Sequence, residues 1–363
     1  MSTHHDVTLK PINEVAKFMK NLMPNNIPEN YALSSVFDNI ASEERIWVGV
    51  NAFRDFLYLF FDRLISDGHL YAKPPKKPNN MTDYPFLYNI SNLLVELGYN
   101  GTLAESGDSL LITNISSHTA TKITGSNMIL CLRFLTLCGF VFTNVDLDAK
   151  TIKILEKLPL EVSYPRNPIM LMGLKVLSIA NMELRTTKRY WNDHIFLGCD
   201  YRALMAKTPE MHEVLEDYLH PLPQRVQEFV LKLHRRYIDI GMTCSLRILG
   251  DINFSYADIS KSKKNLSPTD IYALSVWQIS ISMKNGYCIF IRPKKTNKYA
   301  EIMKNFPLIL QHKIATGYGC DRKRGESCQG GCQGIGIPLD SSILDIAKYI
   351  EIWLDNEMSN LNK

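Results

Sequence analysis

A two-residue turn signal in the last third of the chain restricts most strongly how this sequence can fold. Asn285-Gly286 separates two runs in which apolar residues alternate, residues 277–283 and residues 287–292. Asn-Gly favours the backbone of a tight hairpin turn, so the two runs predict a pair of antiparallel strands. We therefore expect a small antiparallel sheet in this part of the chain. The first of the two runs belongs to a longer strand-like segment, residues 271–283. Residues 242–249 and 334–338 are strand-like as well.

Helical periodicity is the second strong signal. Large apolar side chains recur every three or four residues along residues 53–65, which predicts a helix with one wide apolar face. An aromatic stripe of this kind indicates a protein core more often than a ligand site. The stripe consists of Phe53, Phe56, Leu57, Phe60, Phe61 and Leu64. Helices are also predicted around the C-terminal sheet, at residues 224–237, 300–314 and 341–357.

Breaks in these patterns divide the chain into three expected domains. Residues 73–80 contain three prolines and cannot be helical, so a helical first domain is expected at residues 1–75. Residues 84–205 alternate helices with short hairpins, which is typical of winged-helix and of other α+β domains. Residues 208–363 are expected to form the third domain. The fold class is α+β: a mostly helical N-terminal region with short winged-helix-like hairpins, then a small antiparallel sheet flanked by helices.

Charge and hydropathy indicate the surroundings in which the chain works. Residues 220–363 contain 20 Lys and Arg against 13 Asp and Glu, and a basic region of this kind can attract nucleic acid. The N-terminus lacks the basic start and apolar run of a signal peptide. The most apolar stretch, residues 128–142, is shorter than the roughly 20 residues of a membrane span and contains Arg133. We expect a cytoplasmic protein with reduced thiols, nucleic acid as a candidate partner and no membrane partner.

The C-terminal third also resembles a known group of domains. A helix follows His220-Pro-Leu-Pro223, the hairpin lies within KNGYCIFIRPKK, and Gly334-Ile-Gly-Ile-Pro-Leu-Asp340 leads into a final helix. In this order of elements the region resembles the YdhG-type frataxin-like domains of bacteria. The resemblance implies their fold, and some such domains are described as intracellular iron chaperones. Two departures are a basic rather than acidic composition and a cysteine-rich insertion, so the resemblance supports the fold more than the activity.

That insertion, residues 317–334, contains the candidate metal ligands. Cys320, Cys328 and Cys332 follow a C-x7-C-x3-C spacing in a glycine-rich segment that can turn tightly enough for the sulfurs to converge. Three neighbouring basic residues favour the thiolate form that binds metal. The spacing lacks the usual C-x2-C pair, so a fourth ligand must come from elsewhere. The candidates by proximity in sequence are His312, Asp321 and Cys288.

Four interpretations of these cysteines remain open. Thiolates suit a structural zinc-like site, which would also add folding energy to the segment. Cys328 and Cys332 could instead form a redox-sensing pair, and an iron–sulfur cluster is a third option. The fourth is that the cysteines have no joint role. Zinc is the cofactor we expect first.

Sequence signals for catalysis are weak. His212 and Glu216 are one helical turn apart and resemble part of a zinc-protease motif, but a solvated acidic helix is the simpler interpretation. Trp277, Tyr287 and Arg292 are candidates to line a pocket beside the sheet. Because no nucleophile, phosphate-loop or dinucleotide motif occurs, we expect a non-enzymatic binding or regulatory protein with a cysteine metal site. The alternatives are a nucleic-acid-binding protein and an enzyme with a pocket between its domains.

Overall fold

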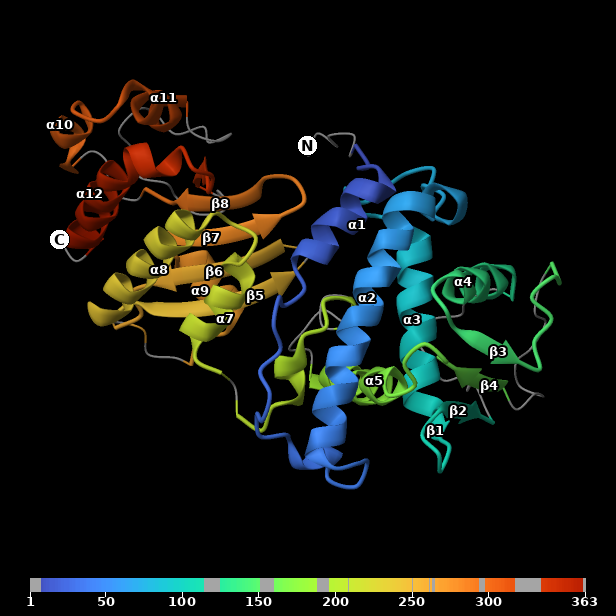
Figure 1. Ribbon diagram of the computed structural model, residues 1–363. Helices are drawn as coiled ribbons and strands as arrows, with labels where there is room; N and C mark the ends of the chain where they lie inside the picture. Colours follow the sequence, from blue (N-terminus) through green and yellow to red (C-terminus); the bar gives the residue numbers. More distant parts are fainter. Residues whose placement is uncertain are drawn as a thin grey trace. The chain divides into compact units, whose positions relative to one another are not determined.

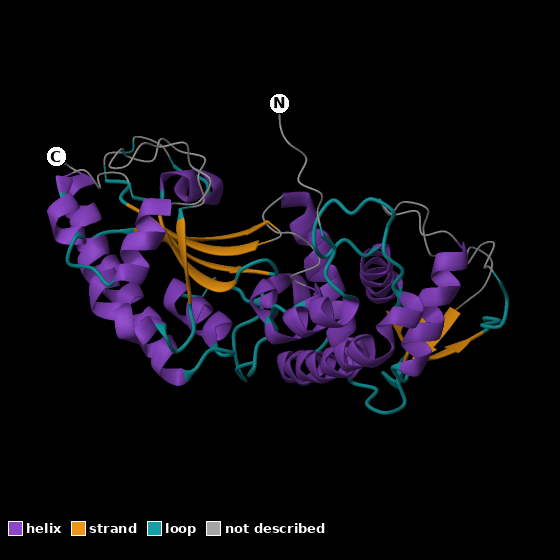
Figure 2. Cartoon of the chain, turned by 90° about the horizontal axis from the view of Figure 1, so that it is seen from above, coloured by secondary structure: helices purple, strands orange, loops and turns teal. Residues whose placement is uncertain are grey.

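The computed structural model separates the chain into two compact units, Met1–Thr208 and Pro209–Lys363. It describes residues 8–113, 125–150, 160–187, 196–207, 209–249, 251–260, 262, 265–293, 298–316 and 334–361. Both units combine helices with an antiparallel sheet, which confirms the α+β class (Figures 1 and 2). None of the helices in the described ranges has the length and apolar composition needed to cross a membrane.

The first unit is built mainly from helices. The predicted helix at residues 53–65 is confirmed and forms the middle of α2, which begins after the capping side chain of Ser42. The described α-helices of this unit are α1 Ile12–Asn21, α2 Glu43–Tyr71, α3 Pro85–Asn100, α4 Gly125–Leu137 and α5 Met170–Thr187. The 3-10 helices are η1 Ser35–Phe37 and η3 Tyr201–Leu204.

The aromatic stripe of α2 forms the centre of the core of this unit, as predicted. Phe56 contacts Phe140 edge to face, with ring centroids 5.2 Å apart. Phe60 contacts Phe134 in the same geometry at 5.5 Å, and Phe53 contacts Phe196 at 5.2 Å. Such pairs add about 0.5–1.5 kcal/mol each to the burial of the rings. Since the buried residues from Ile12 to Leu204 belong to one apolar cluster, this core is continuous across the proline-rich segment.

A small antiparallel sheet completes the first unit. Its strands are β1 Thr102–Leu103, β2 Ser109–Ile112, β3 Val141–Thr143 and β4 Leu160–Ser163, in the order β1-β2-β4-β3. Strands β1 and β2 pair as a hairpin, which is one of the short hairpins expected within residues 84–205. Gly107 provides the positive φ of +79° that this turn requires.

The second unit contains a five-stranded antiparallel sheet in the order β5-β6-β7-β8-β9. Its strands are β5 Thr243–Leu249, β6 Asp251–Ala257, β7 Trp277–Ser282, β8 Gly286–Ile291 and β9 Ile335–Pro338. The Asn285-Gly286 hairpin is confirmed: β7 pairs with β8, and Gly286 has a φ of +63°. The α-helices described here are α7 Met211–Leu219, α8 Gln224–Asp239, α9 Pro268–Leu274, α10 Ala300–Met303, α11 Leu308–Thr316 and α12 Ile343–Leu361.

Helices α7 and α8 cover the apolar face of this sheet and lie in front of it in Figure 1. Tyr218 of α7 contacts Phe254, and Tyr237 of α8 contacts Trp277 at 5.4 Å between ring centroids. Trp277 also stacks on Tyr256 at 3.7 Å, with the two rings nearly parallel. These fully buried rings join the central strands to the helical layer.

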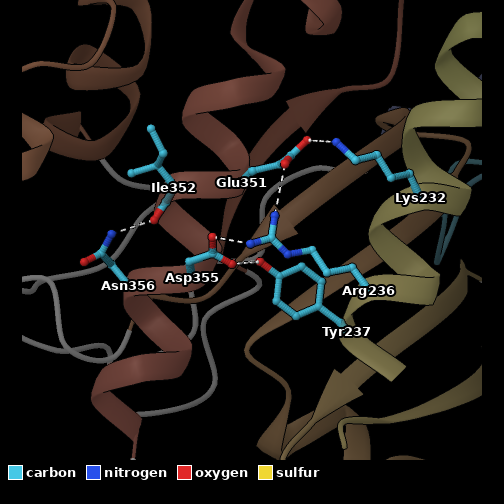
Figure 3. A network of polar contacts seen from close by, with 7 residues as sticks. All are labelled: Lys232, Arg236, Tyr237, Glu351, Ile352, Asp355 and Asn356. Atoms are coloured by element: carbon cyan, nitrogen blue, oxygen red, sulfur yellow. Dashed lines mark hydrogen bonds and ion pairs between the residues drawn. The ribbon is translucent and has the colours of Figure 1, made fainter. Parts of the chain in front are cut away.

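The C-terminal helix α12 is held against α8 by a network of charged side chains (Figure 3). Arg236 binds Glu351 at 3.0 Å and Asp355 at 2.6 Å. Tyr237 donates a hydrogen bond to the second oxygen of Asp355 at 2.9 Å, and Lys232 binds Glu351 at 2.8 Å. Asp355 thus connects the partly exposed network to a buried tyrosine, so α12 and the strand before it are positioned relative to α8.

Two of the predicted segments in the second unit were wrong in detail. Residues 271–283 are not one strand: Ser267 and Asp270 form a capping box with Pro268 in the first turn, so α9 forms before β7 begins. The helix predicted at residues 300–314 is interrupted, because Pro307 separates α10 from α11. Strand β6 was not predicted, although residues 251–257 alternate polar and apolar side chains.

Replacing Gly173 with alanine is expected to destabilise the first unit by about 1–3 kcal/mol, because α2 and α5 cross where two glycines meet. A Cβ at Gly173 would lie 2.1 Å from the carbonyl oxygen of Gly49, and backbone there cannot move aside. Gly68→Ala in α2 is the matched control, since its new Cβ meets side chains and no backbone, Ile12 at 3.2 Å and Leu64 at 3.5 Å. Urea denaturation measures the free energy of unfolding of both variants. Equal stability of the two variants would contradict the close helix crossing.

Candidate functional site

The three predicted metal ligands, Cys320, Cys328 and Cys332, lie outside the described residues, as does Asp321. The chain on either side of them is described. Lys313, near the end of α11, donates a hydrogen bond from Nζ to the carbonyl oxygen of Gly336 in β9 at 3.3 Å. The helix that precedes the cysteine segment is therefore tied to the strand that follows it.

The second flank of the cysteine segment is held just as closely. Gly334 has a φ of +97°, and a Cβ at this position would lie 2.6 Å from the carbonyl oxygen of Ile291 and 3.0 Å from Arg292 Cγ. Glycine is needed here for both its backbone conformation and its small size. The chain thus leaves α11 and enters β9 at the same edge of the sheet, beside β8.

Of the candidate fourth ligands, Cys288 is poorly suited to bind metal. It lies on β8, is 4% exposed, and donates a hydrogen bond from Sγ to the carbonyl oxygen of Asn285 at 3.2 Å. Burial raises the pKa of the Cys288 thiol to about 11, despite the nearby Lys313, so the thiolate form that metals require is disfavoured. His312 is exposed on α11, close in sequence to the cysteine segment, and remains the better candidate.

Other cysteines in the described part of the chain belong to the core. Cys131, Cys138 and Cys199 are buried and not paired in disulfides. Burial raises the pKa of each thiol, to about 12 for Cys131 and Cys138. Within the described ranges, no group of three or more His, Cys, Asp or Glu side chains is placed to hold a metal ion.

His212 and Glu216 do not form a joint site. Glu216 is exposed, whereas the ring of His212 is half-buried and lies 5.5 Å from the ring of His234. Nδ1 of His234 is 2.8 Å from the hydroxyl oxygen of Tyr256, in the layer between α8 and the sheet. Burial lowers the pKa of His234 to about 4, with smaller contributions from His212 and Arg235, so this buried histidine is held neutral.

Trp277, Tyr287 and Arg292 do not line one pocket. Strand alternation places Trp277 and Tyr287 on the face that α7 and α8 cover, and Arg292 on the opposite face. Arg292 binds the end of α9, donating from Nη1 to the carbonyl oxygen of Tyr272 at 2.6 Å. Its guanidinium also lies 4.6 Å from the centroid of the Tyr272 ring.

That opposite face of the sheet is polar although it is buried, and its members other than Arg292 were not predicted as site residues. Its most buried polar side chains come from the central strands β6 and β7, and Arg247 of β5 lies beside them in the register. Helix α9 lies over this face, because Gln278 donates a hydrogen bond to Ser275 at 2.7 Å and Arg247 stacks on Tyr272. The buried polar residues of β6 and β7 are Asn253, Ser255, Gln278, Ser280 and Ser282. The alternation of residues 251–257 was the signal that could have identified the face.

Comparisons with known proteins do not assign the chain to a group. No protein-family model, no curated protein and no solved structure matches it.

We expect Cys288 to react with iodoacetamide far more slowly in the folded protein than in the unfolded chain. With a pKa of about 11, only about one thiol in a thousand is ionised at pH 8, and the side chain is buried as well. Mass spectrometry of peptides after timed alkylation, with and without urea, measures the ratio of rates. A folded-state rate within about tenfold of the unfolded one would contradict the buried environment.

His234 should make the second unit less stable in acid. Its folded pKa of about 4 lies below the ordinary value of 6.5, so between these pH values only the unfolded chain takes up the proton. The stabilising contribution is complete above pH 6.5 and is lost on acidification, on the order of 2 kcal/mol. His234→Phe is expected to flatten the pH dependence of unfolding in urea over that range, whereas His69→Asn, at an exposed position of α2, serves as the control. If the free energy of unfolding of His234→Phe depends on pH as steeply as that of the wild type, His234 is not the cause of the acid sensitivity.

Proposed function

We propose that this protein is a non-enzymatic binding or regulatory protein that holds a metal ion, zinc in the first place, through Cys320, Cys328 and Cys332. The observation that carries the proposal is the attachment of the two flanks of the cysteine segment to one edge of the sheet. Lys313 contacts Gly336, and Gly334 packs against Arg292. The three thiols lie within thirteen residues of the segment that connects the end of α11 to the start of β9, and these two ends are held at one edge of the sheet.

This arrangement lowers the entropic cost of bringing the ligands together. Closing a loop costs conformational entropy that grows with loop length, and here the folded sheet and α11 already hold the ends close. A metal ion that binds the thiolates then contributes its binding free energy to the ordering of the segment. Arg322, Lys323 and Arg324 within the segment favour the ionised form of the thiols.

The described residues also support a particular ligand set. Cys288 is buried, hydrogen-bonded and protonated at neutral pH, which argues against a fourth thiolate from β8. His312 is exposed near the end of α11, so a three-thiolate, one-histidine site is the set that we favour. Tetrahedral zinc accepts this combination of sulfur and nitrogen ligands.

Metal content of the purified protein tests the proposal. Protein prepared under reducing conditions is expected to contain about one zinc per chain, and a variant with serine at positions 320, 328 and 332 is expected to contain almost none. A matched control replaces Ser327, Gln329 and Gln333 of the same segment with alanine and keeps all three thiols. Wild-type protein with less than about a tenth of an equivalent of metal would end the proposal.

Two single variants distinguish the fourth ligand. His312→Asn is expected to lower zinc affinity at least tenfold, which corresponds to about 1.4 kcal/mol, in competition with a chromophoric chelator. Cys288→Ser is expected to leave the affinity unchanged. If Cys288→Ser lowers the zinc affinity and His312→Asn leaves it unchanged, the metal site is kept but Cys288 replaces His312 as its fourth ligand.

A further inference from the structure

On the polar face of the C-terminal sheet, Arg247 and Ser255 each have a buried hydrogen-bond donor for which no described residue is an acceptor. Nε of Arg247 and Oγ of Ser255 are both buried from solvent and have no hydrogen-bond partner within the described ranges. Buried polar groups are nearly always paired, and leaving one unpaired costs about 1–3 kcal/mol. Two such groups on one face therefore indicate that something is normally bound there.

The register brings these two residues together. Arg247 of β5 is opposite Asn253 of β6, and Ser255 is two residues further along the same strand. Residues with this diagonal relation lie on the same face of a sheet, within reach of a long side chain. Arg247 and Ser255 are thus neighbours on the polar face.

Arg247 is held in place by an aromatic ring. Its guanidinium lies 4.2 Å from the centroid of the Tyr272 ring of α9. Stacking of this kind fixes the plane of the guanidinium and leaves its edge to bind another group. Among the described residues, Arg247 forms no salt bridge, although Asp251 is close enough to feel its charge: burial raises the pKa of Asp251, and Arg247 acts against that shift.

Arg292 has a different role on this face. It donates hydrogen bonds to the carbonyl oxygens of Tyr272 and Ala273 and so supports the end of α9. Ser282 is also occupied, because its Oγ accepts a hydrogen bond from the backbone N–H of Asn285 at 3.1 Å. Arg292 and Ser282 are thus used by the fold, whereas no described residue accepts a hydrogen bond from Nε of Arg247 or Oγ of Ser255.

We propose that Arg247 and Ser255 bind the oxyanion group, carboxylate or phosphate, of a small molecule on the polar face of this sheet. An oxyanion supplies the acceptors that both donors lack and a negative charge opposite the guanidinium. Arginine is the side chain best suited to carboxylate and phosphate, because its planar fork matches two oxygens. This site is separate from the cysteine metal site and does not depend on it.

Thermal unfolding with two anions tests the site. Wild-type protein is titrated with inorganic phosphate and, separately, with acetate, at ionic strength matched with sodium chloride. A bound anion stabilises the folded state, so the melting temperature is expected to rise with the concentration of at least one of them. A rise with phosphate alone identifies a phosphate-bearing ligand, and a rise with acetate alone identifies a carboxylate-bearing one.

Variants connect that rise to the two residues. Ser255→Ala is expected to weaken anion affinity about tenfold and, unusually for a buried serine, not to lower the melting temperature without anion, because the lost hydroxyl has no partner. Ser282→Ala is the matched control on the same face: it removes a hydroxyl that is already bonded, so it should lower the melting temperature and keep the anion effect.

Arginine variants give the second line of the test. Arg247→Gln and Arg247→Lys should each reduce anion affinity at least tenfold, the lysine because it lacks the planar fork. Arg235→Gln, at an exposed arginine of α8, should retain wild-type binding. The proposal is overturned if neither anion stabilises the wild type, or if Ser255→Ala and Arg247→Lys respond to anion as the wild type does.

Discussion

The second unit depends on the alternation of side chains along β6 and β7, two strands that are buried on both faces. One face carries Phe254, Tyr256 and Trp277 and packs against α7 and α8. Alternation then requires the intervening residues to lie on the other side, where they are polar. In a sheet that is buried on both faces, apolar side chains on one face are stabilised by packing alone. Polar side chains on the other face need specific hydrogen-bond partners.

That requirement separates scaffold from candidate site. Gln278, Arg292 and Ser282 find their partners in α9 and in the hairpin turn, so they stabilise the fold. Arg247 and Ser255 keep donors without acceptors. The flanks of the cysteine segment lie at the other end of the sheet, at β8 and β9, where Lys313 and Gly334 hold them. One sheet thus presents an oxyanion site near β5 and a segment with three thiols at the opposite edge.

Local patterns in the sequence predicted much of the fold, and their failures have physical reasons. The aromatic stripe of α2 and the Asn285-Gly286 hairpin depend on neighbouring residues alone, and both are confirmed. The segment of residues 268–274 is short and contains several side chains that suit strands, yet the capping box at Ser267 starts a helix there. The candidate site was harder to predict, because an arginine on an edge strand looks like an ordinary surface residue until Tyr272, distant in sequence, stacks on it.

By itself, the sequence determined most of the helices and strands, the positions of the tight turns, and that three thiols occur close together along the chain. These features follow from dihedral preferences and side-chain periodicity, which act over a few residues. Only the tertiary structure decided that Cys288 is a buried thiol, that Trp277 and Arg292 lie on opposite faces, and that Arg247 and Ser255 are neighbours with unused donors. Those facts depend on strand order and on which helix covers which face, and packing over long distances in sequence determines both.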